Sequence, residues 1–219
     1  MSKKINNKHY LITGGLGFIG SAISNLLIEK GERVTIFDNL SRGKRKRVYL
    51  RHPKLNFING DIREMKDVRK SLKTVNVVIH LAYINGTKYF YTRPTEILDV
   101  AVKGILNIID GCKEKRIKEL YLASSSEVYQ TPNKIPTDEN ESLKIPNVHN
   151  PRYSYGGGKI LTELMGVNYG RKFFKKLVIF RPHNVYGPDM GNEHVVPEFI
   201  NRFKKITAKK NSFKIQGTG

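Results

Sequence analysis

Cysteine, tryptophan and acidic residues are scarce in this chain, which has 219 residues, one cysteine and no tryptophan. The lone Cys112 excludes an internal disulfide and a cysteine-rich metal site. No apolar run reaches the roughly 18 residues of a membrane helix, and the basic start is not followed by a signal-peptide core. The histidines show no paired metal-ligand spacing. We expect a cytoplasmic protein with no membrane partner, no metal, and Cys112 in the core or on a helix surface.

Negative charge is also scarce, because 19 Asp and Glu face 39 Lys and Arg, a formal net charge of +20. Such a composition is typical of proteins that bind polyanions. The densest cluster, RGKRKR at 42–47, either binds nucleic acid or is a solvated loop beside an anionic ligand. Aromatic residues are not interleaved with these cations, and no zinc-finger or basic-zipper spacing is present. We therefore do not expect specific nucleic-acid binding.

Short apolar runs alternate with longer amphipathic stretches, a pattern typical of βαβ units that build a parallel sheet. The predicted strands are His9–Thr13, Arg33–Asp38, Leu55–Asn59, Asn76–Leu81, Glu119–Ser124 and Leu177–Arg181. The predicted helices are Gly17–Lys30, Glu64–Leu72, Pro94–Lys115 and Tyr153–Lys175, and 130–151 is predicted to be a long surface loop. The pattern predicts a doubly wound α/β fold of the Rossmann type.

A glycine-rich segment, TGGLGFIG, lies where the first strand ends and the first helix begins. Its glycines at 14, 17 and 20 would let the backbone turn, approach a pyrophosphate, and pack the helix on the strand. Asp38 ends the second strand, where a carboxylate would bond the ribose hydroxyls and repel a 2′-phosphate. The two features predict dinucleotide binding, with NAD favoured over NADP; otherwise Asp38 is an ordinary acid at a strand end.

Tyr155 and Lys159 are four residues apart at the start of a predicted helix, so they share one face. A nearby ammonium, together with a bound nicotinamide cation, would stabilise the phenolate and lower the tyrosine pKa, which makes Tyr155 a candidate general base. This spacing also arises by chance. The three glycines between the two residues indicate close packing, and a hydroxyl-rich strand end, ASSSEVY at 123–129, precedes them.

Together these residues resemble the extended short-chain dehydrogenase/reductases that modify nucleotide sugars, the NAD-dependent epimerase/dehydratase group. The resemblance covers essentially the whole chain. It rests on TGGLGFIG at 13–20, Asp38-Asn-Leu, Gly60-Asp61-Ile62, His80-Leu-Ala82, SSSEVY at 124–129, the Tyr155/Lys159 pair and RPHNVYGP at 181–188. It implies a Rossmann domain, NAD as cofactor and a nucleotide-diphosphate sugar as substrate.

The resemblance also implies residue roles. Ser125 matches the catalytic Ser or Thr of the family, Tyr155 its base and Lys159 its ribose-binding lysine. Ser126 and Asn184 are expected at the substrate, with Asn184 at the diphosphate unless it is only a turn residue. The implied cofactor contacts, with Asp61 and Ile62 at the adenine, are Gly14, Gly17, Phe18, Ile19, Gly20, Asp38, Asn39, Asp61, Ile62, Leu81 and Ala82, besides Tyr155 and Lys159.

Hydride transfer to the nicotinamide would leave a keto-sugar, and the next step separates the subfamilies. A 4,6-dehydratase typically has an Asp-Glu pair where this chain has Ser126-Glu127. Glu127, a further catalytic candidate, keeps a dehydratase or a UDP-glucuronate decarboxylase open, or it is a surface acid. We expect a 4-epimerase. A truncated, non-catalytic NAD-binding protein and a basic polyanion binder are the alternatives of another class.

The chain departs from the family pattern at three places. Ala101 stands where the family usually has Asn, and Gln130 where it usually has Gly. The third departure is the end at Gly219, because the family's substrate contacts continue further. We therefore expect an NAD-binding Rossmann domain at 1–188 and the start of an incomplete substrate-binding portion at 189–219. That portion would hold a basic amphipathic helix after Pro197 and a strand at 212–219. A homodimer stays open.

Overall fold

The computed structural model of the chain describes residues 7–191, 195–206 and 212. The strands are β1 (His9–Thr13), β2 (Arg33–Asp38), β3 (Leu55–Asn59), β4 (Val77–His80), β5 (Glu119–Ala123) and β6 (Lys176–Phe180). The α-helices are α1 (Phe18–Glu29), α2 (Met65–Ser71), α3 (Thr87–Thr92), α4 (Pro94–Glu114), α5 (Ser154–Gly170) and α6 (Val195–Phe203). Three short 3-10 helices are η1 (Arg45–Arg47), η2 (Ser126–Val128) and η3 (Pro151–Tyr153).

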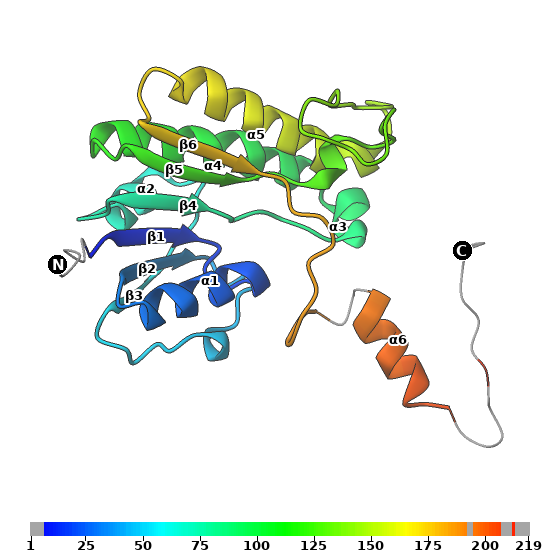
Figure 1. Cartoon of the computed structure of the whole chain (residues 1–219), viewed down its shortest axis with the longest axis horizontal. Coiled ribbons are helices and arrows are strands. Elements are labelled where there is room, and N and C mark those ends of the chain that lie inside the picture. The colour runs from blue at the N-terminus through cyan, green and yellow to red at the C-terminus, as the bar shows by residue number, and fades with distance from the viewer. Residues whose placement is uncertain (1–6, 192–194, 207–211, 213–219) are drawn as a thin grey trace. The chain divides into compact units, whose positions relative to one another are not determined.

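The six strands form one parallel sheet in the order β3-β2-β1-β4-β5-β6 (Figure 1). The chain runs outward from β1 to β3 and then returns to place β4 on the other side of β1. Thr13, the last residue of β1, is level with Phe37 of β2 and His80 of β4. The carboxyl ends of these strands therefore meet at the point where the strand order reverses, which is where open α/β sheets bind ligands. The predicted doubly wound fold is confirmed.

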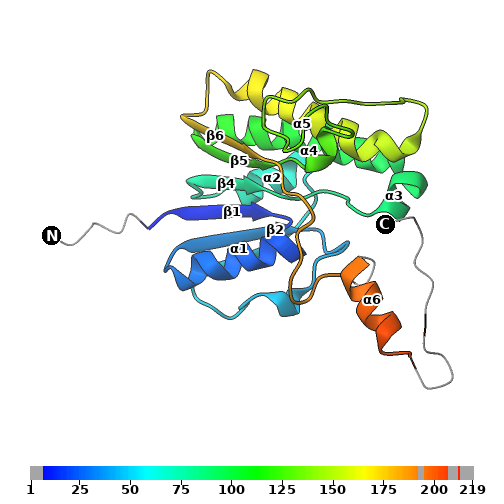
Figure 2. The same cartoon turned by 45° about the vertical axis from the view of Figure 1, so that its right-hand side comes forward.

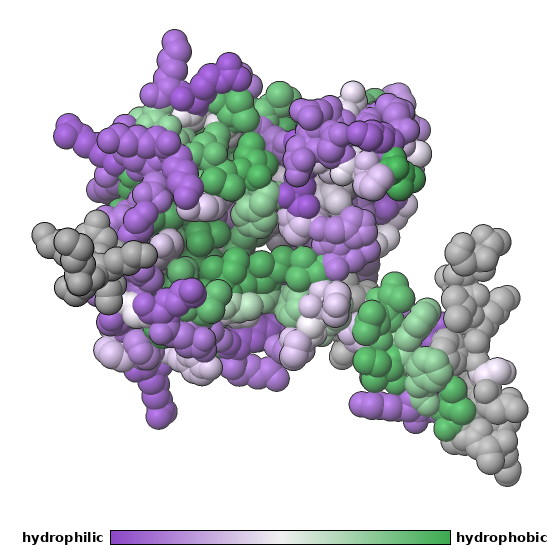
Figure 3. All heavy atoms as spheres, viewed as in Figure 1, coloured by the Kyte–Doolittle hydropathy of each residue, from purple (hydrophilic) through white to green (hydrophobic). Residues whose placement is uncertain are grey.

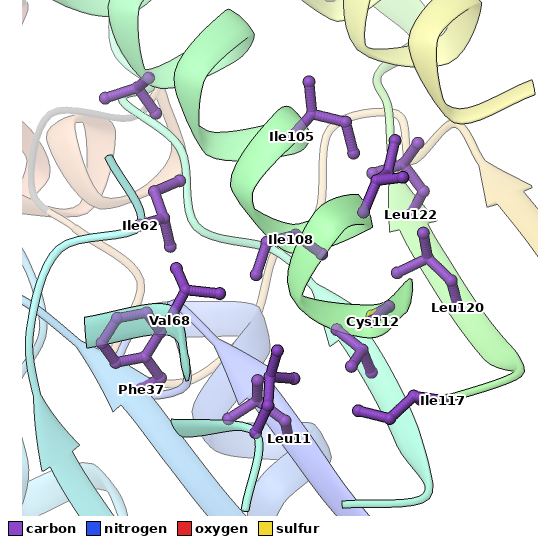
Figure 4. Close-up of a cluster of buried hydrophobic side chains, with 14 of the residues drawn as sticks. Leu11, Phe37, Ile62, Val68, Ile105, Ile108, Cys112, Ile117, Leu120 and Leu122 are labelled. Carbon is purple, nitrogen blue, oxygen red and sulfur yellow. The ribbon is translucent and has the colours of Figure 1, made fainter. Parts of the chain in front are cut away.

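Helices cover both faces of the sheet (Figure 2). On the face of α1, the buried cluster includes Ile12, Leu16, Ile28, Val34 and Ile36. On the opposite face, the larger cluster joins the sheet to α2 and α4 (Figure 4). That cluster is held together by Leu11, Phe37, Ile62, Val68, Ile105, Ile108, Cys112, Ile117, Leu120 and Leu122. Each such side chain contributes about 1.5–3 kcal/mol when it is fully buried.

Helix α4 shows why the sequence folds in this way. Ile97, Ala101, Ile105, Ile108 and Cys112 recur at intervals of three or four, and all five are buried. Cys112 is fully buried, which confirms the core position among the two expected for it. Burial raises the pKa of its thiol to about 12.

Within residues 7–183, one helix end differs from the prediction by more than one residue, and one short helix was not predicted. Helix α5 ends at Gly170 rather than Lys175, because the Gly170 carbonyl accepts the N–H groups of Phe173 and Phe174 in a tight turn. This turn lets Phe174 pack into the core. The short α3 (Thr87–Thr92) was not predicted, since six residues carry no readable period. The predicted surface loop at 130–151 is confirmed as irregular up to η3.

The chain divides into two compact units, 1–183 and 184–219. In the second unit, α6 begins at Val195 rather than after Pro197, because proline is tolerated in the first turn of a helix. The strand expected at 212–219 lies, except for Ser212, outside the described residues.

Within the described part, no helix is long and apolar enough to cross a membrane. Figure 3 shows hydrophobic side chains gathered over the middle of the sheet in the view of Figure 1.

Candidate active site

The glycine-rich loop joins β1 to α1 at the switch point. Gly14 has a φ of +68°, in the left-handed region that favours glycine. Its carbonyl accepts the N–H of Gly17 at 3.0 Å, and a Cβ on Gly20 would lie only 2.2 Å from the same oxygen. The half-buried Phe18 and Ile19 form the first turn of α1. The loop therefore holds the helix N-terminus close to the strand end, in the arrangement that a pyrophosphate requires.

A hydrogen-bonded hub ties β1 to β4 beside this loop. The hydroxyl oxygen of Thr13 accepts the N–H groups of Leu81 and Ala82, each at 3.1 Å, and lies 2.8 Å from Nδ1 of His80. The Thr13 proton is then left to point at His80. Burial, assisted by the charge of Lys159, lowers the pKa of His80 to about 3, so the imidazole stays neutral. The hub fixes Leu81 and Ala82 next to the glycine loop.

Asp38 closes β2 and is almost fully buried. Its Oδ2 accepts the N–H of Leu16 at 3.0 Å, and its Oδ1 accepts that of Leu40 at 2.8 Å. Burial raises the pKa of Asp38, and these two hydrogen bonds oppose the rise. A Cβ on Gly43 would lie 2.6 Å from Oδ1, so the following loop closes on the carboxylate. Each oxygen keeps a second lone pair, which a ribose hydroxyl could use.

Asn39 and Asp61 follow the ends of β2 and β3 and lie next to each other. The Asn39 amide donates to Asp61 Oδ2 at 3.2 Å, and Arg63 pairs with the same oxygen at 2.7 Å. Burial of Asp61 opposes its ionisation, but the hydrogen bonds of Arg63 and Asn39 outweigh this and lower its pKa. The Ile62 side chain is buried against Gly104 of α4. The predicted adenine contacts of these residues stay predictions.

Ser125, Tyr155 and Lys159 come together at the end of β5. Ser125 caps the N-terminus of η2, and its Oγ accepts the N–H of Glu127 at 3.2 Å. Tyr155 and Lys159 lie at the start of α5, and Lys159 Nζ donates to the carbonyl of Ala123 at 2.8 Å. All three side chains are buried. Residues 30 or more positions apart in the sequence are thus assembled beside the switch point, although their catalytic roles stay predictions.

Burial dominates the electrostatics of this cluster. It raises the pKa of Tyr155, while the hydrogen bond with Ser125 lowers it and the charge of Glu127 raises it. Burial lowers the pKa of Lys159 to about 7, with the charge of Glu163 opposing the shift. The groups of this chain therefore do not by themselves lower the Tyr155 pKa. The positive charge expected to do so would have to come from the cofactor.

The remaining predicted positions are more exposed. The Glu127 side chain is 41% exposed and lies 3.5 Å from Arg152, close enough to Tyr155 for its charge to act there. Ser126 is half-buried and donates its N–H to Pro182. Asn184 is exposed and belongs to the second unit. The substrate roles of Ser126 and Asn184 stay predictions.

Two aromatic side chains at this site were not predicted. Phe90 of α3 stacks on the Tyr155 ring at 4.9 Å between centroids, with the planes 23° apart. Tyr83, three residues after β4, meets the Tyr155 ring edge-on at 5.3 Å. The only signal in the sequence was the run of three glycines before Lys159, which indicated close packing. The packing is confirmed, since a Cβ on Gly158 would lie 2.2 Å from the Tyr83 hydroxyl.

Taken together, these residues fit a dinucleotide. The loop between Gly14 and Gly20 is a cradle that a Cβ would fill, Asp38 and Asn39 lie at the end of β2, and Lys159 of α5 is hydrogen-bonded to the last residue of β5. In the described ranges, no group of three or more His, Cys, Asp or Glu side chains could hold a metal ion.

Comparison with known proteins agrees with this geometry. Residues 10–219 match the model of the NAD dependent epimerase/dehydratase family. A Methanocaldococcus jannaschii protein, provisionally named UDP-glucose 4-epimerase, is 36% identical over 89% of this chain and 63% of its own. The UDP-N-acetyl-alpha-D-glucosaminuronate decarboxylase of Bacillus cytotoxicus is 32% identical over 88% of this chain and 60% of its own.

A solved structure is also similar to this chain. The UDP-N-acetylglucosamine 4-epimerase of Methanobrevibacter ruminantium, in complex with UDP-N-acetylmuramic acid, superposes with a TM-score of 0.81 and 30% identity. The match covers 90% of this chain and 63% of that one. The chain thus spans less than two thirds of the length of each of these relatives.

Proposed function

Because the chain belongs to the NAD-dependent epimerase/dehydratase family, whose cofactor is NAD, we propose that it oxidises a nucleotide sugar to a keto-sugar and completes a 4-epimerisation. The observation that carries the proposal is the buried cluster of Ser125, Tyr155 and Lys159 beside the glycine loop. The names of the two relatives describe enzymes that act on UDP-sugars. The Rossmann domain of the proposal is 1–188, and 189–219 begins the substrate-binding portion.

NAD, when bound, accepts the sugar hydride and can return it. The glycine loop and the N-terminus of α1 would hold its pyrophosphate, Asp38 its adenosine ribose, and Lys159 the other ribose. Tyr155 would take the proton of the sugar hydroxyl through its phenolate oxygen, while Ser125 donates a hydrogen bond to the reacting oxygen. The chain's own groups raise the pKa of Tyr155, so the positive charge that ionises it would have to come from the bound cofactor.

The 4-epimerase is preferred over the 4,6-dehydratase because Ser126 stands where the acid that protonates a leaving hydroxyl is expected. Glu127 is 41% exposed and paired with Arg152, which fits a surface acid better than a buried proton donor. A decarboxylase loses carbon dioxide from a keto-acid intermediate and needs no acid at Ser126. It therefore stays the second candidate, supported by the Bacillus cytotoxicus relative.

The basic cluster at 42–47 supports polyanion binding less well than the site residues support an enzyme. Arg42 donates to the carbonyl of Asn85 and lies over the Tyr89 ring, 5.7 Å from its centroid. Arg45 lies 4.9 Å over the Phe57 ring. Two cations of the cluster thus have contacts within the chain, although both residues are exposed.

The test is to incubate the chain with NAD and UDP-sugars and to identify the products by NMR. Inversion at C4 supports the epimerase, a pentose the decarboxylase, and a 4-keto-6-deoxy sugar the dehydratase. In Tyr155→Phe we expect an intact fold and NAD affinity but a turnover lower by about 10²-fold or more, because the proton acceptor is lost.

Ser125→Ala is the matched variant, and we expect it to slow the same step by less. Full activity in Tyr155→Phe contradicts the mechanism. A wild-type chain that binds NAD and converts no UDP-sugar contradicts the catalytic proposal and supports a non-catalytic NAD-binding protein.

A further inference from the structure

Three residues far apart in the sequence converge beneath the catalytic cluster. Tyr83 follows β4, Ala101 lies in α4 and Gly158 in α5. A Cβ on Gly158 would lie 2.2 Å from the Tyr83 hydroxyl and 3.1 Å from the Cβ of Ala101. The glycine at 158 therefore leaves the space that the Tyr83 hydroxyl occupies. The Tyr83 hydroxyl is buried and has no hydrogen-bond partner among the described residues, so the hydroxyl itself does not explain a tyrosine here.

The ring of Tyr83 has the contacts that its hydroxyl lacks. Lys159 Nζ lies 3.8 Å over the centroid of the Tyr83 ring, a cation–π contact in a buried site. The same ring meets Tyr155 edge-on, with the planes 89° apart. One side chain thus contacts both residues that the proposed function uses for proton transfer and cofactor binding.

Few other groups support the Lys159 ammonium, and the Tyr155 ring is farther from it, with its centroid 5.9 Å from Nζ. The carbonyl of Ala123 accepts one hydrogen bond. The charge of Glu163, one turn along α5, raises the Lys159 pKa, but both oxygens of Glu163 are bonded to Arg181 at 2.9 and 2.7 Å. His80 from β4 is buried and neutral, and adds no charge. The π face of Tyr83 is therefore a main source of stabilisation for the cation.

We propose that Tyr83 is a positioning residue, whose ring face holds the Lys159 ammonium and whose ring meets Tyr155 edge-on to orient it, and that Gly158 provides the room for it. This proposal rests on the proposed function, which assigns the roles of Lys159 and Tyr155. The contacts of Tyr83 with these two residues involve only side chains of this chain.

The first experiment measures Lys159 in the full chain. Lysine-labelled protein is titrated by NMR, with the Lys159 signal assigned by its loss in Lys159→Met. In Tyr83→Leu, which keeps a similar apolar volume but no π face, we expect the Lys159 pKa to fall by about one unit. In Tyr83→Phe we expect no fall, because the ring face is retained.

Phe90→Leu is the matched control. It removes the other ring that packs on Tyr155, at 4.9 Å, and should leave the Lys159 titration unchanged. An unchanged Lys159 titration in Tyr83→Leu overturns the proposal. An equal fall in Tyr83→Phe and Tyr83→Leu overturns it too, because the hydroxyl rather than the ring would be responsible.

The second experiment reads the consequence for the cofactor. If NAD binding needs the Lys159 ammonium, NAD dissociation constants of Tyr83→Leu and wild type should agree near pH 5. At pH 8 the dissociation constant of Tyr83→Leu should be about tenfold larger than that of the wild type, because a pKa lower by one unit leaves about a tenth as much Lys159 protonated. Parallel pH profiles would contradict the positioning role.

A third experiment tests the fit without Tyr83→Leu. Gly158→Ala should lower the melting temperature of the wild type, because its Cβ would lie 2.2 Å from the Tyr83 hydroxyl, and should lower that of Tyr83→Phe, which lacks this oxygen, by clearly less. Equal losses in both backgrounds overturn the packing claim. Full turnover in Tyr155→Phe with a shifted Lys159 in Tyr83→Leu would refute the proposed function and leave the contact standing.

Discussion

Gly20→Ala tests whether the glycine loop is built for a cofactor. The added Cβ would lie 2.2 Å from the carbonyl oxygen of Gly14 and 2.8 Å from the Cα of Gly15. Ordinary contacts of this kind are about 3.4 Å or longer, so the loop or the start of α1 must move by about 1 Å. The obstacle is backbone, which cannot turn aside as a flexible side chain can.

The structure gives the size of the effect. Overpacking of this kind costs about 1–3 kcal/mol, and in a chain of this length each kcal/mol lowers the melting temperature by about 2–4 °C. We expect a loss of about 2–12 °C. A shift of 1 Å also misplaces the amides that face the pyrophosphate, and NAD affinity should fall by about 10- to 100-fold, measured by calorimetry.

Gly31→Ala is the matched control for this prediction. Gly31 has a φ of +80°, so alanine is strained there, but the nearest atom to its Cβ would be Lys54 Nζ at 3.6 Å. It lies in the turn after α1, at the opposite end of that helix from the glycine loop. We expect a comparable loss of stability with unchanged NAD affinity. If Gly20→Ala binds NAD like the wild type, the loop has been assigned the wrong role.

Two further predictions concern single side chains. Asp38→Asn should lower NAD affinity and narrow the preference for NAD over NADP, measured by calorimetry with both cofactors; unchanged selectivity would mean that Asp38 acts only as the acceptor for Leu16 and Leu40. His80 has a folded-state pKa of about 3, below its unfolded value of 6.5, so its contribution to stability is complete above pH 6.5 and is lost as the pH falls toward 3. Between pH 6.5 and 5, wild type should lose about 2 kcal/mol more than His80→Asn, which still accepts from Thr13, and equal losses in denaturant titrations would exclude His80 as the sensor.

The strands of the sheet were predictable because each is a short apolar run that ends at a chemically distinct residue. Thr13, Asp38 and Asn59 all mark carboxyl ends in the structure. The parallel order followed from the alternation with helices. The end of α5 was not predictable, because the turn at Gly170 depends on Phe174 packing into a core that the local pattern does not describe.

The candidate site was predictable to the extent that its residues occur in local spacings. The glycines at 14, 17 and 20, and the pair Tyr155 and Lys159, are each confined to a few positions. Tyr83 and Phe90 were missed because neither belongs to a recognisable local motif. Their partner Tyr155 is more than 60 positions away in the sequence. Only the sheet order brings the segment after β4 next to the start of α5.

The burial of Lys159 decides how this site can be altered. An ammonium that is almost fully buried is stable only if several groups share the cost of its desolvation. Here the contacts come from Tyr83 and Ala123, and Glu163 adds its charge while it is held by Arg181, which follows β6. Since these groups come from four separate segments, we expect a substitution that removes one of these interactions to change the charge state of Lys159 at neutral pH, where its pKa of about 7 already lies. The Tyr155 and Lys159 motif therefore sets the identity of the proposed catalytic groups, and the surrounding segments influence their protonation.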